Sequence, residues 1–326
     1  MAVPNLTFLG GNVMGQNPLL TIAVPVFNGA GDLALTLESL EGLDDPRVEI
    51  LVSDNASNDS SVTEAESFLQ GPLPFMKIYV QTTNLGPSGN CKFLASQAMG
   101  EFIWFLSAGE TVSHQSLANI LDIVSQNRNV NNFVLTGRIR ANEAVSETLC
   151  TFRDKGKTPF SETIALNIIR TSFARNISKA EREDPWPHIE AILLGASNPF
   201  TTLFVSSGVL VEISENKQGW WYHSPFVWQI YCEKIKFISW FQQNNKSSIW
   251  ASRDLNTLRK MQFLLMSYET RKHNVNFSSE DLRIARNSGI PISHLLVARV
   301  ANFVPRIIFR FTSGLFGRLA KWRARL

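Results

Sequence analysis

The sequence predicts an α/β fold in which a mainly parallel sheet is flanked by helices. Over roughly the first 140 residues, apolar runs of strand length alternate with stretches of helical periodicity, a pattern typical of βαβ units. The first apolar run, residues 19–27, is nearly continuous, as expected of a strand buried on both faces. Hydrophobic residues make up 44% and charged residues 18% of the chain, which is enough apolar material for a large core.

Each element in this part of the chain has a local signal. Leu33, Leu37 and Leu40 recur at helical spacing and predict the first helix. Ser61 and Glu64 have the spacing of a capping box and predict the start of the second. The expected strands are residues 19–27, 48–52, 76–80, 102–106 and 133–139, and the expected helices are residues 32–40, 61–69, 88–99 and 116–124.

The later part of the chain predicts a different organisation. Beyond residue 161 the pattern becomes more helical, and residues 224–243 are rich in Trp, Phe and Ile. Residues 191–211 carry no charge, but Gly, Asn, Pro, Ser and Thr interrupt them, which favours a buried helix and strand over a membrane span. We therefore expect an α/β domain at residues 17–215 and a helical region at residues 216–326.

Several classes of protein lack support in this sequence. No G-x-G-x-x-G follows the first strand and no G-x-x-x-x-G-K-[ST] is present, so dinucleotide and P-loop sites lose their main signal. Cys91, Cys150 and Cys232 lie far apart without C-x-x-C spacing, which predicts buried thiols in a reducing compartment. The N-terminal residues show no basic segment followed by an apolar one, so no secretory signal is expected.

Small and polar residues follow four consecutive expected strands. The sequences are PVFNG at residues 25–29, SDNASND at 53–59, TNLG at 83–86 and LSAGE at 106–110. In open parallel sheets, ligands bind beyond the carboxyl ends of the strands. The sequence therefore predicts a ligand site at this edge of the sheet.

The same motifs resemble those of glycosyltransferase family 2 over roughly residues 19–125. LTIAVPVFNGAGDLALTLESL resembles the family's opening strand, which ends in P-x-[YF]-N, and EILVSDNASND resembles its second-strand motif. NLGPSGNCKFLASQAMGEFIWFLSAGE is similar to the N-x-G-x-x-x-N helix and the metal-binding D-x-D position. The W-P-H of residues 186–188 looks most like the abequosyltransferase-like branch. The resemblance implies the GT-A nucleotide-diphospho-sugar transferase fold at residues 17–215.

The resemblance implies that Asp54 binds the nucleotide. A carboxylate at the end of a buried strand can accept a hydrogen bond from a base N–H or a ribose hydroxyl, whereas the alternative is an ordinary turn Asp. Turn formation is also the alternative for Asn84 and Gly86, and a solvated helix face is the alternative for Lys92. The further positions that resemble donor-binding residues are Pro25, Phe27, Asn28, Asn84, Gly86, Asn90 and Lys92.

Glu110 is the expected metal ligand. The family places two or three Asp here to hold Mg²⁺ or Mn²⁺ on the donor diphosphate, whereas this chain has Ser107, Ala108, Gly109 and Glu110. One carboxylate can suffice, because Mg²⁺ is often held by one or two carboxylates together with phosphate oxygens and water. The alternative is that Glu110 is a solvent-facing loop acid.

Two residues are candidates for the catalytic base. An inverting transfer needs a base within hydrogen-bond reach of the acceptor hydroxyl. The family often places it in an E-D pair, which here is Glu183 and Asp184; Asp184 before Pro185 is also typical of an ordinary N-cap. His188 follows four residues later and would share a helix face with Asp184; it could be the base, a donor to the phosphate or a metal ligand, although a lone His is more often structural.

The C-terminal tail is basic. After Asp281 the chain has no acidic residue and nine basic ones, whereas the rest of the chain has 22 basic and 28 acidic residues. In residues 294–326 the basic side chains gather largely opposite the aromatic and aliphatic ones, which predicts peripheral binding to an anionic membrane surface on its cytoplasmic side. The alternative is a pair of helices docked on the domain. The nine basic residues are Arg283, Arg286, Arg299, Arg306, Arg310, Arg318, Lys321, Arg323 and Arg325.

The expected activity is that of an inverting glycosyltransferase. The resemblance implies that a hexosyl or deoxyhexosyl group moves from a nucleoside-diphosphate sugar to a hydroxyl of a glycan or lipid-linked oligosaccharide, in the synthesis of bacterial surface polysaccharides. No nucleic-acid partner is expected. The alternative is a catalytically inactive nucleotide- or glycan-binding member of the fold, which the incomplete D-x-D position favours.

Overall fold

The computed structural model describes most of the N-terminal part of the chain. By their contacts, the residues divide into one unit of Met1–Phe152 with Thr158–Lys217 and another of Arg153–Lys157 with Gln218–Leu326. The second unit lies outside the described residues except for Arg283, so the domain division at residue 215 stays a prediction. The described residues are 7–10, 17–135, 147–151, 164–177, 187–188, 191–192, 201–205, 211–213 and 283.

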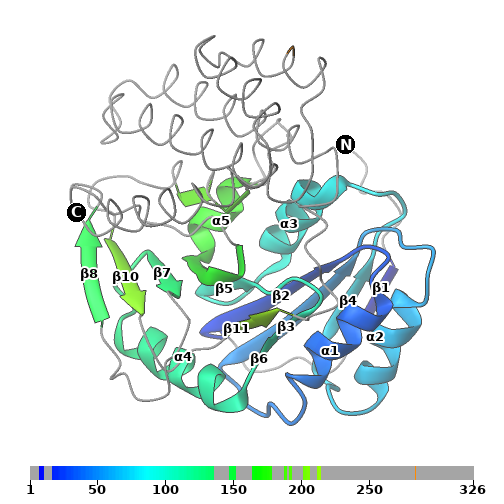
Figure 1. The fold of residues 1–326 in the computed structure, drawn as a ribbon, viewed down its shortest axis with the longest axis horizontal. Coiled ribbons are helices and arrows are strands. Elements are labelled where there is room, and N and C mark those ends of the chain that lie inside the picture. Colours follow the sequence, from blue (N-terminus) through cyan, green and yellow to red (C-terminus); the bar gives the residue numbers. More distant parts are fainter. Residues whose placement is uncertain are drawn as a thin grey trace, which may run out of the picture. The chain divides into compact units, whose positions relative to one another are not determined.

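A mixed sheet forms the centre of the first unit (Figure 1). Its nine described strands follow the order β1-β4-β3-β2-β5-β9-β7-β10-β8, and β6 pairs with β11 in a separate two-stranded sheet. The strands are β1 (Thr7–Gly10), β2 (Leu20–Val26), β3 (Val48–Asp54), β4 (Lys77–Val80), β5 (Phe102–Phe105), β6 (Glu110–Val112), β7 (Asn132–Leu135), β8 (Glu147–Thr151), β9 (Asn167–Arg170), β10 (Thr201–Val205) and β11 (Val211–Ile213).

The α/β fold predicted from the sequence is confirmed, with more antiparallel pairing than expected. Strands β4, β3, β2 and β5 are parallel neighbours, and so are β7 and β10. In contrast, β1, β8 and β9 pair antiparallel with their neighbours. Beyond residue 161, where the sequence predicted a more helical pattern, the described residues form α5 but also β9, β10 and β11, which complete the two sheets.

The helices that connect the strands from β2 to β5 lie on opposite faces of the sheet. The chain crosses from β2 to β3 to β4 in one direction and then returns to β5 on the other side of β2. Because strand–helix–strand connections are right-handed, this reversal places α1 and α2 on one face and α3 on the other (Figure 1). The described helices are α1 (Ala30–Glu38), α2 (Ser61–Gln70), α3 (Gly86–Gln97), α4 (His114–Gln126) and α5 (Thr171–Ile177), with a 3₁₀ turn at Ile164–Leu166.

The main apolar core lies between the sheet and α1. Side chains alternate between the faces of a strand, so Ile22 and Val24 of β2 point to the same side. Both are fully buried together with Leu33 and Leu37 of α1. Burying a Leu or Ile side chain stabilises a fold by about 1.5–3 kcal/mol, so this face holds the sheet and helix together. The predicted helical spacing of the Leu residues is thereby confirmed.

The opposite face of the same strands buries a charged network. Glu49 of β3 is 5% exposed, and its Oε2 accepts hydrogen bonds from Thr21 Oγ1 at 2.7 Å and from the Met99 N–H at 2.8 Å. Lys77 of β4 donates to Oε1 of Glu49 at 2.8 Å. Thr21 Oγ1 also accepts the Gly100 N–H at 2.9 Å, at a position where a Cβ would lie 2.5 Å from the Thr21 nitrogen. The network therefore ties β2, β3 and β4 to the turn before β5.

The predicted capping box of the second helix was wrong. Helix α2 begins at Ser61, but its N-cap residue is Ser60, which makes no side-chain cap hydrogen bond. The Ser61 hydroxyl instead donates to Asp59 Oδ1 at 2.5 Å and accepts the Gly29 N–H at 3.1 Å. Since the hydroxyl serves the loop before the helix, it is not used as the predicted cap.

No helix in the described part of the chain is both long and apolar enough to cross a membrane. Residues 191–192 are helical and buried, and residues 201–205 form β10, in agreement with the predicted buried helix and strand.

Candidate functional site

The carboxyl ends of the parallel strands meet at one edge of the sheet. Val26, Asp54 and Val80 are register partners on β2, β3 and β4. The Asn55 N–H continues the ladder to the Val26 carbonyl at 2.9 Å, and the Gln81 N–H continues it to the Asp54 carbonyl at 2.9 Å. The structure therefore brings together the loops that begin after residues 26, 54 and 80, as the sequence predicted.

Asp54 lies at the centre of this edge. Its side chain is 1% exposed, and its Oδ2 accepts the Ser57 N–H at 2.9 Å. Its Oδ1 is also buried but has no hydrogen-bond partner among the described residues. A buried carboxylate oxygen without a partner is costly, so such a group in a native fold calls for a ligand or solvent donor. The residue therefore fits a ligand that presents an N–H or O–H group.

The loop after β2 is tied to the loop after β3. Asn28 adopts φ +49°, its N–H donates to Ser57 Oγ at 2.8 Å, and its Oδ1 accepts the Asn58 N–H at 2.9 Å. These bonds fix the backbone next to Phe27, whose side chain is 48% exposed, while Pro25 is half-buried within β2. Phe27 therefore presents an aromatic ring to solvent from a restrained loop.

The loop after β4 is held by a residue that the sequence prediction missed. Asn55 is 2% exposed; its Nδ2 donates to Asn84 Oδ1 at 2.9 Å and to the Gly86 carbonyl at 3.2 Å. Its Oδ1 accepts the Leu85 N–H at 2.8 Å. Gly86 begins α3 with φ +73°, a conformation that glycine adopts at little cost. The signal for Asn55 was its place beside Asp54 in the second-strand motif.

Asn90 joins α3 to β3 beneath this loop. Its Nδ2 donates to the Ser53 carbonyl at 2.9 Å, and its Oδ1 accepts from Ser53 Oγ at 2.6 Å. Gln81 Nε2 donates to the same hydroxyl at 3.2 Å. Asn90 is 2% exposed, so its observed contacts are structural, while Lys92, two residues further along α3, is half-buried.

The loop between β5 and β6 buries Glu110. The side chain is 6% exposed, and its Oε2 accepts the Ser107 N–H at 2.7 Å. Thr36 of α1 donates to the Glu110 carbonyl at 2.9 Å and accepts the Gly109 N–H at 2.8 Å, with Gly109 at φ +85°. Glu110 is therefore not the solvent-facing acid that was the alternative. The anchoring role of Thr36 was not foreseen from the sequence.

The loop offers a cation only a single carboxylate. No group of three or more His, Cys, Asp or Glu suited to a metal occurs in the described residues. One carboxylate fits Mg²⁺ or Mn²⁺ held mainly by phosphate oxygens and water, but not a cage built from protein ligands alone. The metal role of Glu110 stays a prediction.

The candidate bases are described only in part. His188 is 1% exposed within a helical pair of residues, 187–188, and Asp184 lies outside the described residues. The choice between them stays a prediction.

Burial raises the pKa of the Cys91 thiol to about 12, so this thiol stays protonated and does not act as a nucleophile.

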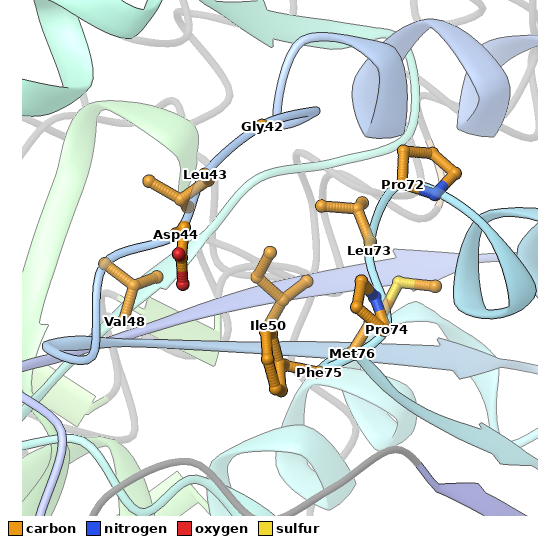
Figure 2. Close-up of a pocket in the computed structure, with 10 residues that line it drawn as sticks. All are labelled: Gly42, Leu43, Asp44, Val48, Ile50, Pro72, Leu73, Pro74, Phe75 and Met76. Atoms are coloured by element: carbon orange, nitrogen blue, oxygen red, sulfur yellow. The ribbon is translucent and has the colours of Figure 1, made fainter.

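An apolar cavity of about 220 Å³ lies at the other edge of the sheet (Figure 2). Val48, which begins β3, and Met76, which precedes β4, both line it. Since these are the amino ends of the strands, the cavity is separate from the edge that carries Asp54.

Comparison with known proteins supports the family predicted from the motifs. Residues 21–162 match the family described as "Glycosyl transferase family 2". The "GalNAc(5)-diNAcBac-PP-undecaprenol beta-1,3-glucosyltransferase" of Campylobacter jejuni is 28% identical over 104 residues, which cover 32% of this chain and 34% of that protein. An uncharacterized glycosyltransferase of Haemophilus influenzae is 25% identical over 110 residues, which cover 34% of this chain and 44% of that protein. The chain therefore matches less than half of either relative's length.

Solved structures share the fold at low sequence identity. S. aureus TarS 1–349 in complex with UDP-GlcNAc has a TM-score of 0.57 and 16% identity, covering 87% of this chain and 88% of that one. A mannosyltransferase from Pyrobaculum calidifontis in complex with GDP-Man and Mn²⁺ has a TM-score of 0.54 and 13% identity, covering 88% and 87%. The abequosyltransferase-like branch stays a prediction. The chain therefore has the GT-A fold that its motifs predicted, and its residues 21–162 are similar to glycosyltransferase family 2.

Proposed function

We propose that the protein transfers a sugar from a nucleoside-diphosphate donor to an acceptor hydroxyl with inversion. The observation that carries this proposal is Asp54, whose buried Oδ1 lacks a partner among the described residues, at the carboxyl edge of the sheet in the segment that matches family 2. An ionised carboxylate only accepts hydrogen bonds, so it matches the N–H of a base or the hydroxyls of a ribose.

The compared proteins support the proposed classes of donor and acceptor. TarS and the P. calidifontis enzyme are described in complex with UDP-GlcNAc and GDP-Man, and the C. jejuni enzyme is named for an undecaprenol-linked glycan. We extend these classes to this chain as a nucleoside-diphosphate hexose or deoxyhexose donor and a glycan or lipid-linked oligosaccharide acceptor. Synthesis of a bacterial surface polysaccharide is the process that we propose for it.

The reaction would be a single displacement. The acceptor oxygen forms a bond to the anomeric carbon as the bond to the diphosphate oxygen breaks, and the acceptor proton passes to a base. We propose Asp184 or His188 as that base. Glu110 is the residue that would hold Mg²⁺ or Mn²⁺, which when bound supplies positive charge to the departing diphosphate. Asp54 and the loops beside it bind and orient the donor.

We also propose that the basic tail attaches the protein to the cytoplasmic side of the cell membrane. The tail, residues 294–326, lies outside the described residues, so the support is the sequence pattern alone. Its basic residues suit anionic headgroups, and its aromatic and aliphatic residues suit the interface below them. If the acceptor is lipid-linked, attachment to the membrane would keep the active site near the acceptor.

The test of the donor site is nucleotide-induced stabilisation of Asp54→Ala. A ligand at about 100 times its Kd stabilises the native state by about 2.7 kcal/mol, which corresponds to roughly 5–10 °C in melting temperature. UDP, GDP, CDP and dTDP would be tested on the parent, on Asp54→Ala and on Asp44→Asn, a change at an exposed Asp on the amino side of the sheet. The parent and Asp44→Asn should shift with one of them. If Asp54→Ala shifts as far as the parent, the proposed donor site is wrong.

A non-catalytic binding protein is the second candidate function. The observation that favours it is the loop of residues 107–110, which contains one carboxylate where family 2 enzymes have two or three. Hydrolysis of the stabilising nucleotide's sugar derivatives, measured with and without Mn²⁺, separates the two. A protein that binds the nucleotide but turns over none of them would be the binding member.

A further inference from the structure

Two adjacent residues at the end of β3 differ in their hydrogen bonding. Asp54 keeps a buried carboxylate oxygen without a partner. The side chain of Asn55 makes three hydrogen bonds, donating to Asn84 Oδ1 and the Gly86 carbonyl and accepting from the Leu85 N–H. All three partners lie at residues 84–86. The two residues therefore differ in role: Asp54 can accept a hydrogen bond from a ligand, whereas the hydrogen bonds of the Asn55 side chain go to this turn.

The partners of Asn55 form an exposed turn that shapes the edge beside Asp54. Asn84 and Leu85 are exposed, and Gly86 opens α3 in a left-handed conformation. Asn84 Oδ1 also accepts the Gly86 N–H at 2.8 Å, which closes the turn on itself. Among the described residues, the hydrogen bonds between this turn and the loop after β3 all involve the side-chain amide of Asn55. The conformation of residues 84–86 therefore depends on a buried side chain that lies 29 positions before Asn84.

An amide is the functional group that suits these partners. Asn supplies two N–H donors and a carbonyl acceptor, which match the two oxygens and the one N–H of the turn. Asp has the same shape but no donor when ionised. It would place a negative charge against Asn84 Oδ1 and the Gly86 carbonyl and next to the Asp54 carboxylate, so Asn55→Asp should release the turn.

We propose that Asn55 is a positioning residue that holds residues 84–86 beside the proposed donor site in the conformation that binds the nucleotide. This inference rests on the proposed function, because it assumes that a nucleotide binds at Asp54. Asn55 acts through the turn and does not itself touch the ligand. A loop that is ordered in advance costs less entropy to order on binding, so loss of the amide should appear as loss of affinity.

The experiment measures nucleotide affinity by calorimetry in the full-length protein, together with melting temperature and hydrogen exchange of the Leu85 amide. The nucleotide is whichever of UDP, GDP, CDP and dTDP binds the parent. In Asn55→Asp, the Leu85 amide hydrogen should exchange faster with solvent. The variant should also bind the nucleotide about tenfold more weakly, a loss of about 1.4 kcal/mol in binding free energy. Gln115→Glu is the control, because it adds the same charge at an exposed side chain of α4, outside the loops of the proposed donor site. It should bind within about twofold of the parent.

A second cycle separates positioning from direct contact. If Asn55 acts through the turn, Asn84→Ala and Asn55→Asp remove one shared interaction. The double variant should then lose little more affinity than whichever single variant binds the nucleotide more weakly. Losses that multiply would show that Asn55 acts independently of Asn84, and would overturn the inference. Asn55→Ser, which keeps one donor and one acceptor, serves the same test if Asn55→Asp does not fold.

The remaining outcomes distinguish the inference from the proposed function. If Asp54→Ala loses the nucleotide while Asn55→Asp binds as tightly as the parent, the inference fails and the donor site stands. If Asn55→Asp melts lower but keeps its affinity, Asn55 supports only the fold and the inference fails. If the parent binds none of the four nucleotides, the proposed donor site fails, and the inference fails with it.

Discussion

Removing one partner of the buried ion pair between Glu49 and Lys77 should destabilise the protein strongly. It lies on the α3 side of the sheet, in the strands whose far ends carry the donor site. Lys77→Met removes the ammonium group but keeps a long apolar side chain. The Glu49 carboxylate would then remain 5% exposed with two hydrogen bonds, from the Thr21 hydroxyl and the Met99 N–H.

The expected loss is about 3 kcal/mol. Removing one partner of a buried ion pair typically costs about 3–5 kcal/mol, because a charge is left without compensation in a poorly solvated site. The lower end of the range applies, since Lys77 keeps 16% of its side-chain exposure and Glu49 keeps two donors. For a domain of about 150–250 residues, each kcal/mol shifts the melting temperature by roughly 2–4 °C, so Lys77→Met should melt roughly 6–12 °C lower.

Thermal and urea unfolding at neutral pH check this value against a matched surface pair. Arg47 bonds to Asp45 at 2.7 Å, but its side chain is 42% exposed, so Arg47→Met should cost less than about 1 kcal/mol. Adding Glu49→Gln to Lys77→Met removes the uncompensated charge and should recover part of the loss. If Lys77→Met costs no more than Arg47→Met, or if Glu49→Gln lowers the stability of Lys77→Met further, the reasoning about the buried charge is wrong.

Three further predictions concern the proposed activity. Glu110→Gln keeps an oxygen for the Ser107 N–H but removes the charge, so turnover with Mn²⁺ should fall about 10²-fold while the melting temperature changes little; full parent activity in EDTA would contradict the metal role. Of Asp184→Asn and His188→Gln, the variant at the true base should lose about 10²-fold or more in kcat, and small equal losses would exclude both. Full-length protein should float with anionic liposomes, less so at high salt, whereas a chain ending at Pro291 should not; equal flotation of the two would contradict the membrane role of the tail.

The early strands and helices were predictable because their signals are local. Residues 19–27 are apolar without interruption, and β2 occupies residues 20–26 of them. The Leu spacing that predicted the first helix matches the buried face of α1. The family resemblance was predictable for a related reason, since each motif is a short segment that follows one strand, and four such segments agreed.

The antiparallel strands were not predictable from the same signals. The sequence NIIR of β9 is too short to show a period, and its antiparallel partners β5 and β7 are distant in the sequence. β1 is four residues long and pairs with β4, about 70 positions later. A short apolar run has the same composition in a helix and in a strand, so its partner decides between them.

The sequence by itself determined which residue types stand at the carboxyl edge of the sheet, because the local periodicity of apolar residues indicates the order of strands, helices and loops along the chain. Only the tertiary structure decided what each side chain does there. It left Asp54 Oδ1 without a partner, turned Glu110 inward to the Ser107 N–H, and used Asn55 to hold the turn at residues 84–86. Such contacts depend on strand register and on loop conformation. They join atoms that are distant in sequence, as between Thr36 and Glu110, and no local pattern specifies which donor will meet which acceptor.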